Sequence, residues 1–317
     1  MKKIVLILLT AMIAVTLFSC TGIAIHETGS ERASNQISPV PENIASTDNI
    51  INFYYGYNDE QFLVCDSRSM SIKDNEDGIS TVLNALIGGP QSANSSFTTL
   101  INGDTRIVDI SENDNYLFIT FSSDFLAQPD DFRNSGMREN VRRYLAVYSV
   151  IDTVLEYSNY DFVQIFIDRD NTGAGTPITN EECGLSGDES FEARGRNGSI
   201  ILNEINTVKE IMASIESKDW NRLYDFVAYE DADGSDRPSY NDFRNAITAD
   251  NVSISNTEVI GQAWATDGIH TRIFVNFTQS SASMQPSYRN DLSVGIVRER
   301  SLWKITYSEL MKTFING

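Results

Sequence analysis

Apolar and polar positions along this chain repeat with two periods, and each period predicts a type of secondary structure. β-branched and aromatic runs predict five strands in the first half, at 50–57, 61–72, 105–111, 116–121 and 162–167. Apolar positions three or four residues apart predict two helices, over about 77–87 and 138–157, with Asn75 or Asp77 as the cap of the first. The order β-β-α-β-β-α-β predicts a compact α+β unit with both helices on one face of a sheet.

The second half shows the helical period first and the strand period afterwards. Apolar positions predict helices at about 202–217, 219–226 and 240–247, and then strands at 252–264, 271–277, 292–300 and 303–307. Residues 169–198 contain six Gly and no clear period, which is typical of a linker or an excursion. We therefore predict two compact α+β domains, each with helices packed on a mainly antiparallel or mixed sheet, at 49–168 and 199–317.

The first twenty residues have the pattern of a secretory signal peptide. Lys2 and Lys3 precede an apolar run of about 15 residues, shorter than the about 20 that a spanning helix needs. The run ends in Leu17-Phe18-Ser19-Cys20, which resembles a bacterial lipobox, and this resemblance implies that Cys20 is lipidated. The alternatives are an uncleaved anchor or an ordinary signal peptide with a chance Cys. Residues 21–48 are rich in Ser, Asn, Pro and Glu and predict a flexible tether. We expect a protein that is lipid-anchored on the extracytoplasmic face of the cell membrane.

The amino-acid composition argues against several classes of binding site. The chain has 24 Lys and Arg against 44 Asp and Glu, a net charge of −20, which argues against nucleic-acid binding. Two His and three Cys leave little material for a metal site. Among the cysteines, Cys65 and Cys183 either form a disulfide in the oxidising exterior or are two separate buried thiols. We expect no catalytic residue, no metal and no cofactor.

Several residues carry weaker chemical signals that we weigh against structural roles. His270 lacks a partner acid recognisable by spacing, so a turn position is favoured over general-base catalysis. The segments 168–173 and 231–236 faintly resemble calcium loops, although Asp and Gly are also the natural residues of solvated turns. Acids such as Glu139 and Glu156 favour a solvated face over a glycosidase pair. The aromatic run at 53–57 favours a buried strand over a partner surface.

Five motifs in the first half together resemble the GerMN domain of sporulation and spore-germination proteins. They are a helix end, a turn, a strand end, a second helix end and a closing strand, at 83–90 (LNALIGGP), 101–105 (INGDT), 117–125 (LFITFSSDF), 153–157 (TVLEY) and 163–168 (VQIFID). Arg169 stands where the family's closing Gly is expected. None of these motifs places a nucleophile beside a base.

The resemblance implies a non-enzymatic, membrane-tethered module that scaffolds or supports an envelope complex, including the channel-like assembly of sporulating cells. Its expected partners are envelope proteins or further copies of itself. Similar domains also occur in lipoproteins that regulate membrane sensors, so a regulatory role is an alternative.

The second half resembles a nuclear transport factor 2-like cone. The resemblance is carried by the helical stretch 217–226 (SKDWNRLYDF) and by the terminal stretch 302–307 (LWKITY). Such cones include both enzymes and inert binding modules. A small-ligand or isomerase-like pocket lined by Trp264, Phe274 and Trp303 is therefore the alternative function, with core packing as the default role of all three.

Overall fold

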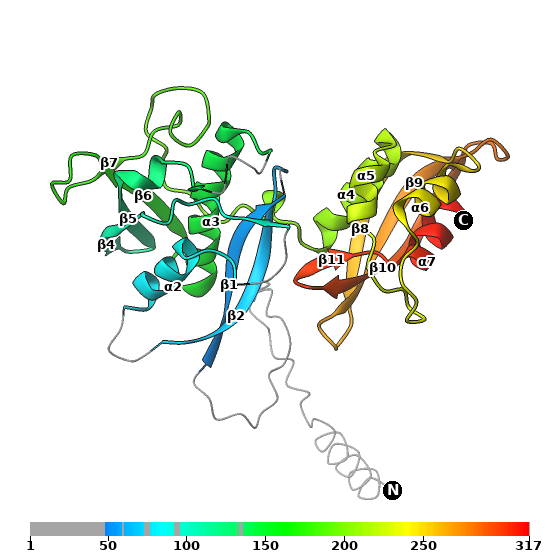
Figure 1. The fold of residues 1–317 in the computed structure, drawn as a ribbon, viewed down its shortest axis with the longest axis horizontal. Coiled ribbons are helices and arrows are strands. Elements are labelled where there is room, and N and C mark those ends of the chain that lie inside the picture. The colour runs from blue at the N-terminus through cyan, green and yellow to red at the C-terminus, as the bar shows by residue number, and fades with distance from the viewer. Residues whose placement is uncertain are drawn as a thin grey trace, which may run out of the picture. The chain divides into compact units, whose positions relative to one another are not determined.

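The protein has the predicted α+β class. The computed structural model describes residues 48–58, 60–72, 77–91, 96–130, 132 and 136–316, and these form helices and three separate sheets (Figure 1). The signal peptide and the tether, apart from Asp48, lie outside the described residues. Among the residues that the structure describes, no helix combines the length and hydrophobicity needed to span a bilayer.

The first half contains two sheets where one was expected. Strand β1 (Asp48–Tyr57) lies between β2 (Leu63–Ser71) and the short β3 (Phe97–Thr98), antiparallel to both. The second sheet has the order β4 (Ile107–Asn113), β5 (Tyr116–Ser122), β6 (Phe162–Asp168) and β7 (Thr176–Pro177), with β5 and β6 parallel. The split has a physical reason, because four neighbouring aromatic residues of β1 are all buried and need cover on both faces of that strand: Phe53, Tyr54, Tyr55 and Tyr57.

Two helices hold these sheets together. Of the two predicted caps, Asn75 lies outside the described residues, and Asp77 caps helix α2 (Gly78–Ile87), with its carboxylate accepting the N–H of Ile79 at 3.1 Å. Helix α3 (Glu139–Tyr157) contacts both β1 and β6, and it is buried over most of its length. Figure 1 shows α3 beside β1 on one side and the β5–β6 pair on the other. A helix covered on two sides explains why its apolar positions do not form one narrow stripe.

The second half combines one four-stranded sheet with helices, the first of which packs on the sheet while the next two follow it along the chain. These helices are α4 (Glu204–Ser217), α5 (Trp220–Asp225) and α6 (Tyr240–Thr248). The antiparallel sheet has the order β11 (Leu302–Lys304), β10 (Ser287–Glu299), β9 (His270–Ser280) and β8 (Ser253–Trp264). Strand β10 starts earlier than predicted because a bulge between Arg289 and Leu292 lets the pairing with β9 continue.

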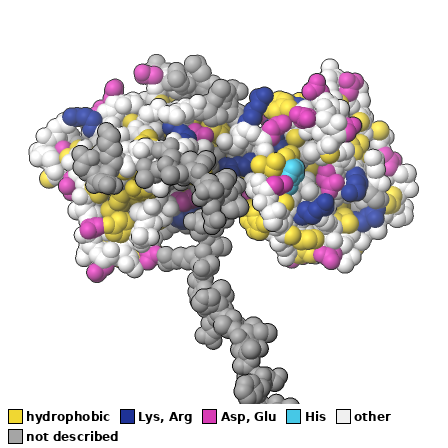
Figure 2. Space-filling model, turned by 90° about the horizontal axis from the view of Figure 1, so that it is seen from below, with side chains coloured by type: hydrophobic (Ala, Val, Ile, Leu, Met, Phe, Trp, Pro, Cys, Tyr) yellow, Lys and Arg dark blue, Asp and Glu magenta, His cyan; other side chains and the backbone are white. Residues whose placement is uncertain are grey.

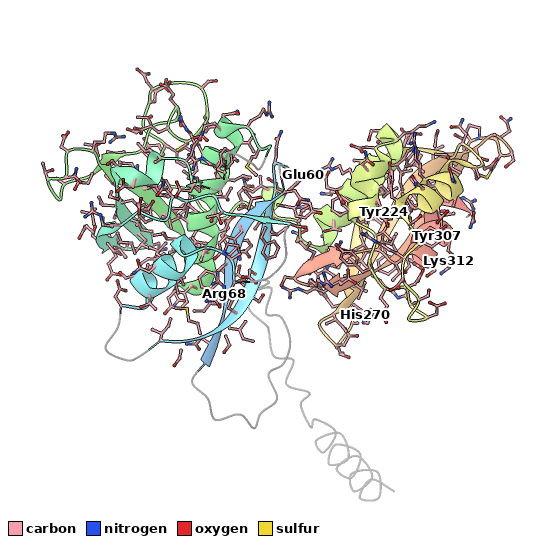
Figure 3. All side chains as sticks on the ribbon, viewed as in Figure 1. Glu60, Arg68, Tyr224, His270, Tyr307 and Lys312 are labelled. Carbon is pink, nitrogen blue, oxygen red and sulfur yellow. The ribbon has the colours of Figure 1, made fainter. Side chains whose placement is uncertain are left out.

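The predicted final strand ends sooner than expected. Tyr307 does not extend β11 but begins helix α7 (Tyr307–Leu310), which is followed by a helical turn at Met311–Ile315. The Thr306 side chain caps α7 by accepting the N–H of Glu309 at 3.3 Å. Tyr307 lies near Tyr224 in an aromatic cluster centred on the buried Phe243, with ring centroids 6.3 and 5.1 Å from that ring (Figure 3).

Candidate functional site

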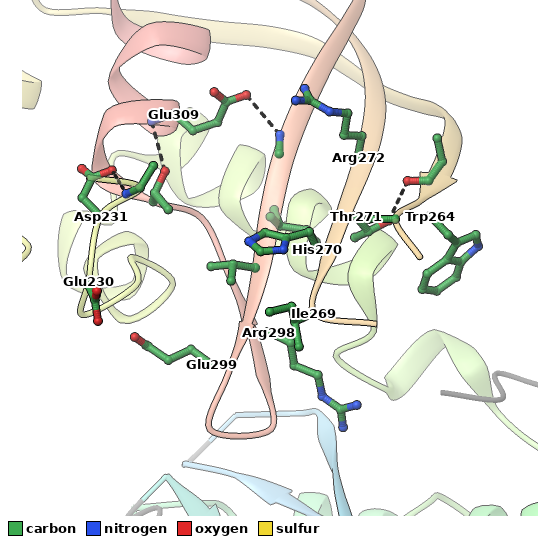
Figure 4. A pocket seen from close by; sticks show the side chains of 17 residues that line it. Glu230, Asp231, Trp264, Ile269, His270, Thr271, Arg272, Arg298, Glu299 and Glu309 are labelled. Atoms are coloured by element: carbon green, nitrogen blue, oxygen red, sulfur yellow. Dashed lines mark hydrogen bonds between the residues drawn. The ribbon is translucent and has the colours of Figure 1, made fainter. Parts of the chain in front are cut away.

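A groove of about 750 Å³ lies beside the strand ends of β8, β9 and β10. It is bounded by Trp264 and Ile269 on one side and by the 230–232 loop and Glu309 on the other (Figure 4). Gly295, opposite Arg272 in the register of β9 and β10, adds no side chain to the floor. The volume lies within the range of small-molecule sites.

Most acids of this groove are engaged with the protein itself. Asp231 accepts the N–H of Ser308 at 2.9 Å, and Glu309 accepts the N–H of Gly295 at 3.1 Å. Glu299 accepts the backbone N–H of Tyr229 at 3.1 Å. These carboxylates therefore hold backbone segments in place around the groove.

His270 has an acid partner that spacing did not reveal. Its ring Nδ1 lies 2.7 Å from Oδ2 of Asp267, three residues earlier, at the turn before β9 (Figure 4 labels His270). Hydrogen bonds from the His270 ring and from two backbone N–H groups lower the pKa of Asp267 to about 2. Both side chains are about half exposed. Figure 2 shows the histidine on a surface with acidic, basic and hydrophobic side chains around it. In the described part of the chain, no Ser, Thr or Cys is hydrogen-bonded to this ring.

The three residues predicted to line a pocket do not come together. Trp264 lines the groove and is 57% exposed. Phe274 is opposite Gly261 in the sheet, whereas Trp264 is opposite Thr271, and positions 271 and 274 lie on opposite faces of β9. Trp303, on β11, is opposite Arg298 of β10 and does not border the groove.

The interior face of the same sheet is filled by side chains. Ile273, Val275 and Phe277 of β9 are fully buried, and the ring of Phe277 lies 5.3 Å from that of Phe314. The groove is thus a surface feature and is separate from the packed centre of the second half.

The structure describes two of the three cysteines, and both are shielded from solvent to some degree. Cys20 lies outside the described residues. Cys65 and Cys183 are both free thiols, Cys65 half-buried and Cys183 fully buried. Burial is the main cause that raises the pKa of each thiol to about 12. A thiol of this kind is a poor nucleophile at neutral pH.

The two acidic segments have the geometry of turns. In the first, both oxygens of Asp168 accept backbone N–H groups, from Thr172 at 3.0 Å and Gly173 at 2.9 Å. In the second, Asp233 accepts the N–H of Ser235 at 2.9 Å. Within the described ranges, His, Cys, Asp and Glu side chains form no cluster that could hold a metal ion.

The candidate carboxylates are bound to arginines. Glu139 pairs with Arg142 at 2.7 Å, and hydrogen bonds from arginines outweigh its partial burial and lower its pKa. Glu156 pairs with Arg196 at 2.7 Å and accepts a hydrogen bond from the hydroxyl of Tyr54. These acids therefore stabilise the fold.

Asp152 is a buried carboxyl whose hydrogen bonding is incomplete. It lies on α3, is fully buried, and accepts the backbone N–H of Asn197 at 2.9 Å through Oδ1. Its Oδ2 has no hydrogen-bond partner among the residues that the structure describes. Burial raises the pKa of Asp152 to about 7, although the Asn197 N–H and the charge of Arg196 act in the opposite direction.

The aromatic residues of β1 and those of β5 and β6 have different roles. The run at 53–57 is buried, as the sequence favoured. The sequence did not single out a second group, on the face of β5 and β6 that points away from α3. We call this group the outer aromatic face, and it consists of Tyr116, Phe118, Phe162 and Phe166.

Strand alternation separates this face from the core. Leu117, Ile119 and Phe121 of β5 are buried. Of the alternate positions, Tyr116 is exposed and Phe118 is half-buried. The alternation Tyr-x-Phe on β5 was the available signal, since neighbouring aliphatic positions already marked the buried side.

Comparison with known proteins bears on the first half. Residues 52–171 match the domain family model Germane, described as sporulation and spore germination. This confirms the resemblance to a GerMN-type domain over those residues, which make up little more than a third of the chain. No curated protein matches the chain.

Three similar solved structures each align with slightly less than half of this chain. Tandem GerMN domains of the sporulation protein GerM from Bacillus subtilis are 18% identical, over 45% of this chain and 46% of that one, with a TM-score of 0.27. The first GerMN domain of the same protein is 20% identical, over 45% and 97%, with a TM-score of 0.27. A candidate lipoprotein from Clostridium perfringens is 19% identical, over 49% and 93%, with a TM-score of 0.28. The chain thus spans about half the length of the tandem structure.

Proposed function

We propose that this protein is a lipid-anchored, extracytoplasmic component that supports a protein assembly of the cell envelope and catalyses no reaction. The observation that carries the proposal is the match of residues 52–171 to a sporulation and germination domain. In this mechanism the lipidated Cys20 holds the chain on the membrane, residues 21–48 act as the tether, and the GerMN-type half binds neighbouring proteins.

The chemistry of the first half supports a binding role. Its principal carboxylates are engaged by arginines or backbone N–H groups, as at Glu139, Glu156 and Asp168. Its two thiols have pKa values raised to about 12, far from those of activated nucleophiles. Such a surface offers contacts to a partner instead of reactive groups to a substrate.

The experiment has two parts. Cys20→Ala should move the chain from the membrane fraction to the soluble extracytoplasmic fraction, whereas Cys183→Ala, which keeps the lipobox, should stay with the membrane. Cross-linking the intact protein on cells and identifying the products should then recover envelope-assembly or sporulation proteins. A chain that fractionates identically with and without Cys20, or that yields only monomer, contradicts the proposal.

A second candidate function is small-ligand binding in the groove of the second half, favoured by its volume of about 750 Å³. Trp264 at the rim provides the assay, because a ligand beside it should change its fluorescence. A screen of small carboxylates and amines that leaves Trp264 emission unchanged, with Trp264→Phe as the reference, would reject this candidate.

A further inference from the structure

We propose that the outer aromatic face is the docking site for an amphipathic α-helix of another protein, one whose apolar stripe is flanked by Lys or Arg. This inference rests on the proposed function, since it names the surface and the partner chemistry through which the GerMN-type half would bind. This site is supported by the four rings, their exposure and the acids around them.

The rings form one continuous apolar surface across two strands. Tyr116 and Phe162 are opposite each other in the parallel pairing of β5 and β6, with centroids 5.0 Å apart. Phe118 extends this surface to both sides, at 6.4 Å from Tyr116 and 6.0 Å from Phe166. Tyr116 and Phe162 remain 40% and 38% exposed. Exposed, contiguous aromatic surface is a feature of interfaces more than of free surfaces.

The dimensions fit a helix. Two neighbouring strands lie about 4.8 Å apart, and a helix with its side chains is about 10 Å wide, so one helix covers both strands. The rings extend over four residues along the strands, about 13 Å, which corresponds to about nine residues of helix. Because an added strand binds at a sheet edge and not on its face, a helix is the natural cover for this surface.

The charges around the rings select the partner. The strands β4, β5 and β6 contain no Lys or Arg. Asp109 is on the same face, opposite Thr120, while Asp114 and Asp161 lie at the turns beside Tyr116 and Phe162. The guanidinium of Arg194, next to β6, lies over the ring of Phe191, 5.1 Å from its centroid. Acids beside apolar rings, on strands that contain no cation, favour a partner that supplies Lys or Arg.

The same charges argue against other occupants. A second copy would bring acids against acids in a protein of net charge −20, and an anionic lipid surface would be repelled as well. A glycan would stack flat on a ring face, but Tyr116 and Phe162 stack on each other with an interplanar angle of 21°, so one face of each ring is already covered.

The test begins with a photo-cross-linker in the full chain on cells. Benzoylphenylalanine replaces Ser111, which is exposed and opposite Phe118, and in a control chain it replaces Tyr288 of the second half. The expected product from position 111 is a single other protein, cross-linked within a segment that has apolar residues at helical spacing and flanking Lys or Arg. A synthetic peptide of that segment is then the probe for binding to the purified chain.

Two sets of variants measure that binding. Tyr116→Ser with Phe162→Ser should weaken it about tenfold or more, while Ile260→Ser with Tyr288→Ser, exposed residues of the second half, should leave it unchanged. Asp109→Asn with Asp114→Asn should weaken it severalfold and reduce its dependence on salt. Circular dichroism checks folding, and Phe162→Ser alone is the fallback variant.

Several outcomes would overturn the inference. They are a cross-link to a second copy, to lipid or to glycan, no cross-link at all, a segment without the helical apolar pattern, or binding that survives the loss of both rings. If co-purified partners persist in the double ring variant, this inference fails while the proposed function stands. If the wild-type chain recovers no partner, both fail.

Discussion

Asp152→Asn should make the protein's stability less dependent on pH, and the structure gives the magnitude. The carboxyl is fully buried on α3, where its pKa is raised from 3.8 to about 7, with Arg196, Glu156 and the backbone N–H of Asn197 as the neighbouring charged and polar groups. A carboxyl whose pKa is higher in the folded state than in the unfolded state binds its proton more tightly when folded. Its contribution to stability is therefore complete below pH 3.8 and is lost as the pH rises to about 7.

These values predict a specific loss. Between pH 5 and pH 8 the wild-type chain should lose about 2.5 kcal/mol of unfolding free energy through Asp152 alone. Asn cannot ionise, and its oxygen can still accept the N–H of Asn197. The variant should therefore gain about 2.5 kcal/mol relative to wild type over this pH range, although its NH₂ group finds no evident acceptor and lowers stability by about 1–3 kcal/mol at every pH.

Urea unfolding followed by circular dichroism at pH 5 and pH 8 measures both free energies. The quantity of interest is the change, from one pH to the other, in the difference between variant and wild type, because other titrating groups cancel in it. Asp188→Asn, at an exposed carboxylate, is the matched control and should show no such change. Parallel pH profiles for Asp152→Asn and wild type would refute the reasoning that burial raises this pKa.

Three further expectations follow from buried groups. Arg142→Ala should cost about 3–5 kcal/mol in urea unfolding, because it removes a fully buried side chain and leaves the carbonyl of Leu100 without its guanidinium donor. Arg143→Ala, at a partly exposed helix pair, should cost less than about 1 kcal/mol, and equal losses would contradict this. Gly184→Ala should lower the unfolding free energy by about 3 kcal/mol or more, since φ is +79° and a Cβ would lie 2.0 Å from a backbone oxygen. A neutral effect would contradict this expectation. In a Cys20→Ala chain, Cys65 and Cys183 should not react with a thiol reagent at pH 8 until urea unfolds the protein. The mass of the chain should show no disulfide between them. Rapid labelling of the folded protein would contradict both expectations.

The sequence predicts the long periodic elements well. The expected helix at 138–157 is found as Glu139–Tyr157, because twenty residues of regular apolar spacing outweigh local ambiguity. Asp77, one of the two caps expected for α2, is the cap found, since a short acidic side chain before an apolar helix satisfies a free backbone N–H. These features depend on neighbours within one turn.

The missed features depend on register, which local patterns do not contain. Bulges in β8 between Ser255 and Glu258 and between Val259 and Gly261 shift the residues that follow, so the face on which Trp264 lies is not set by its sequence spacing from Phe274. The division of the first half into two sheets likewise depends on which strands pair across α3. The domain boundaries, the lipidation of Cys20 and the identity of the partners stay predictions.

The alternation in β5 and β6 has a consequence for how this protein can change over generations. Positions such as Leu117 and Val163 determine whether the sheet packs on α3, while Tyr116 and Phe162, one residue away, face outward. Substitutions on the outward positions therefore alter recognition at little cost to folding. Two lineages can keep the same core and diverge in the molecule they bind, so a GerMN-type domain can be retained while its partner is replaced.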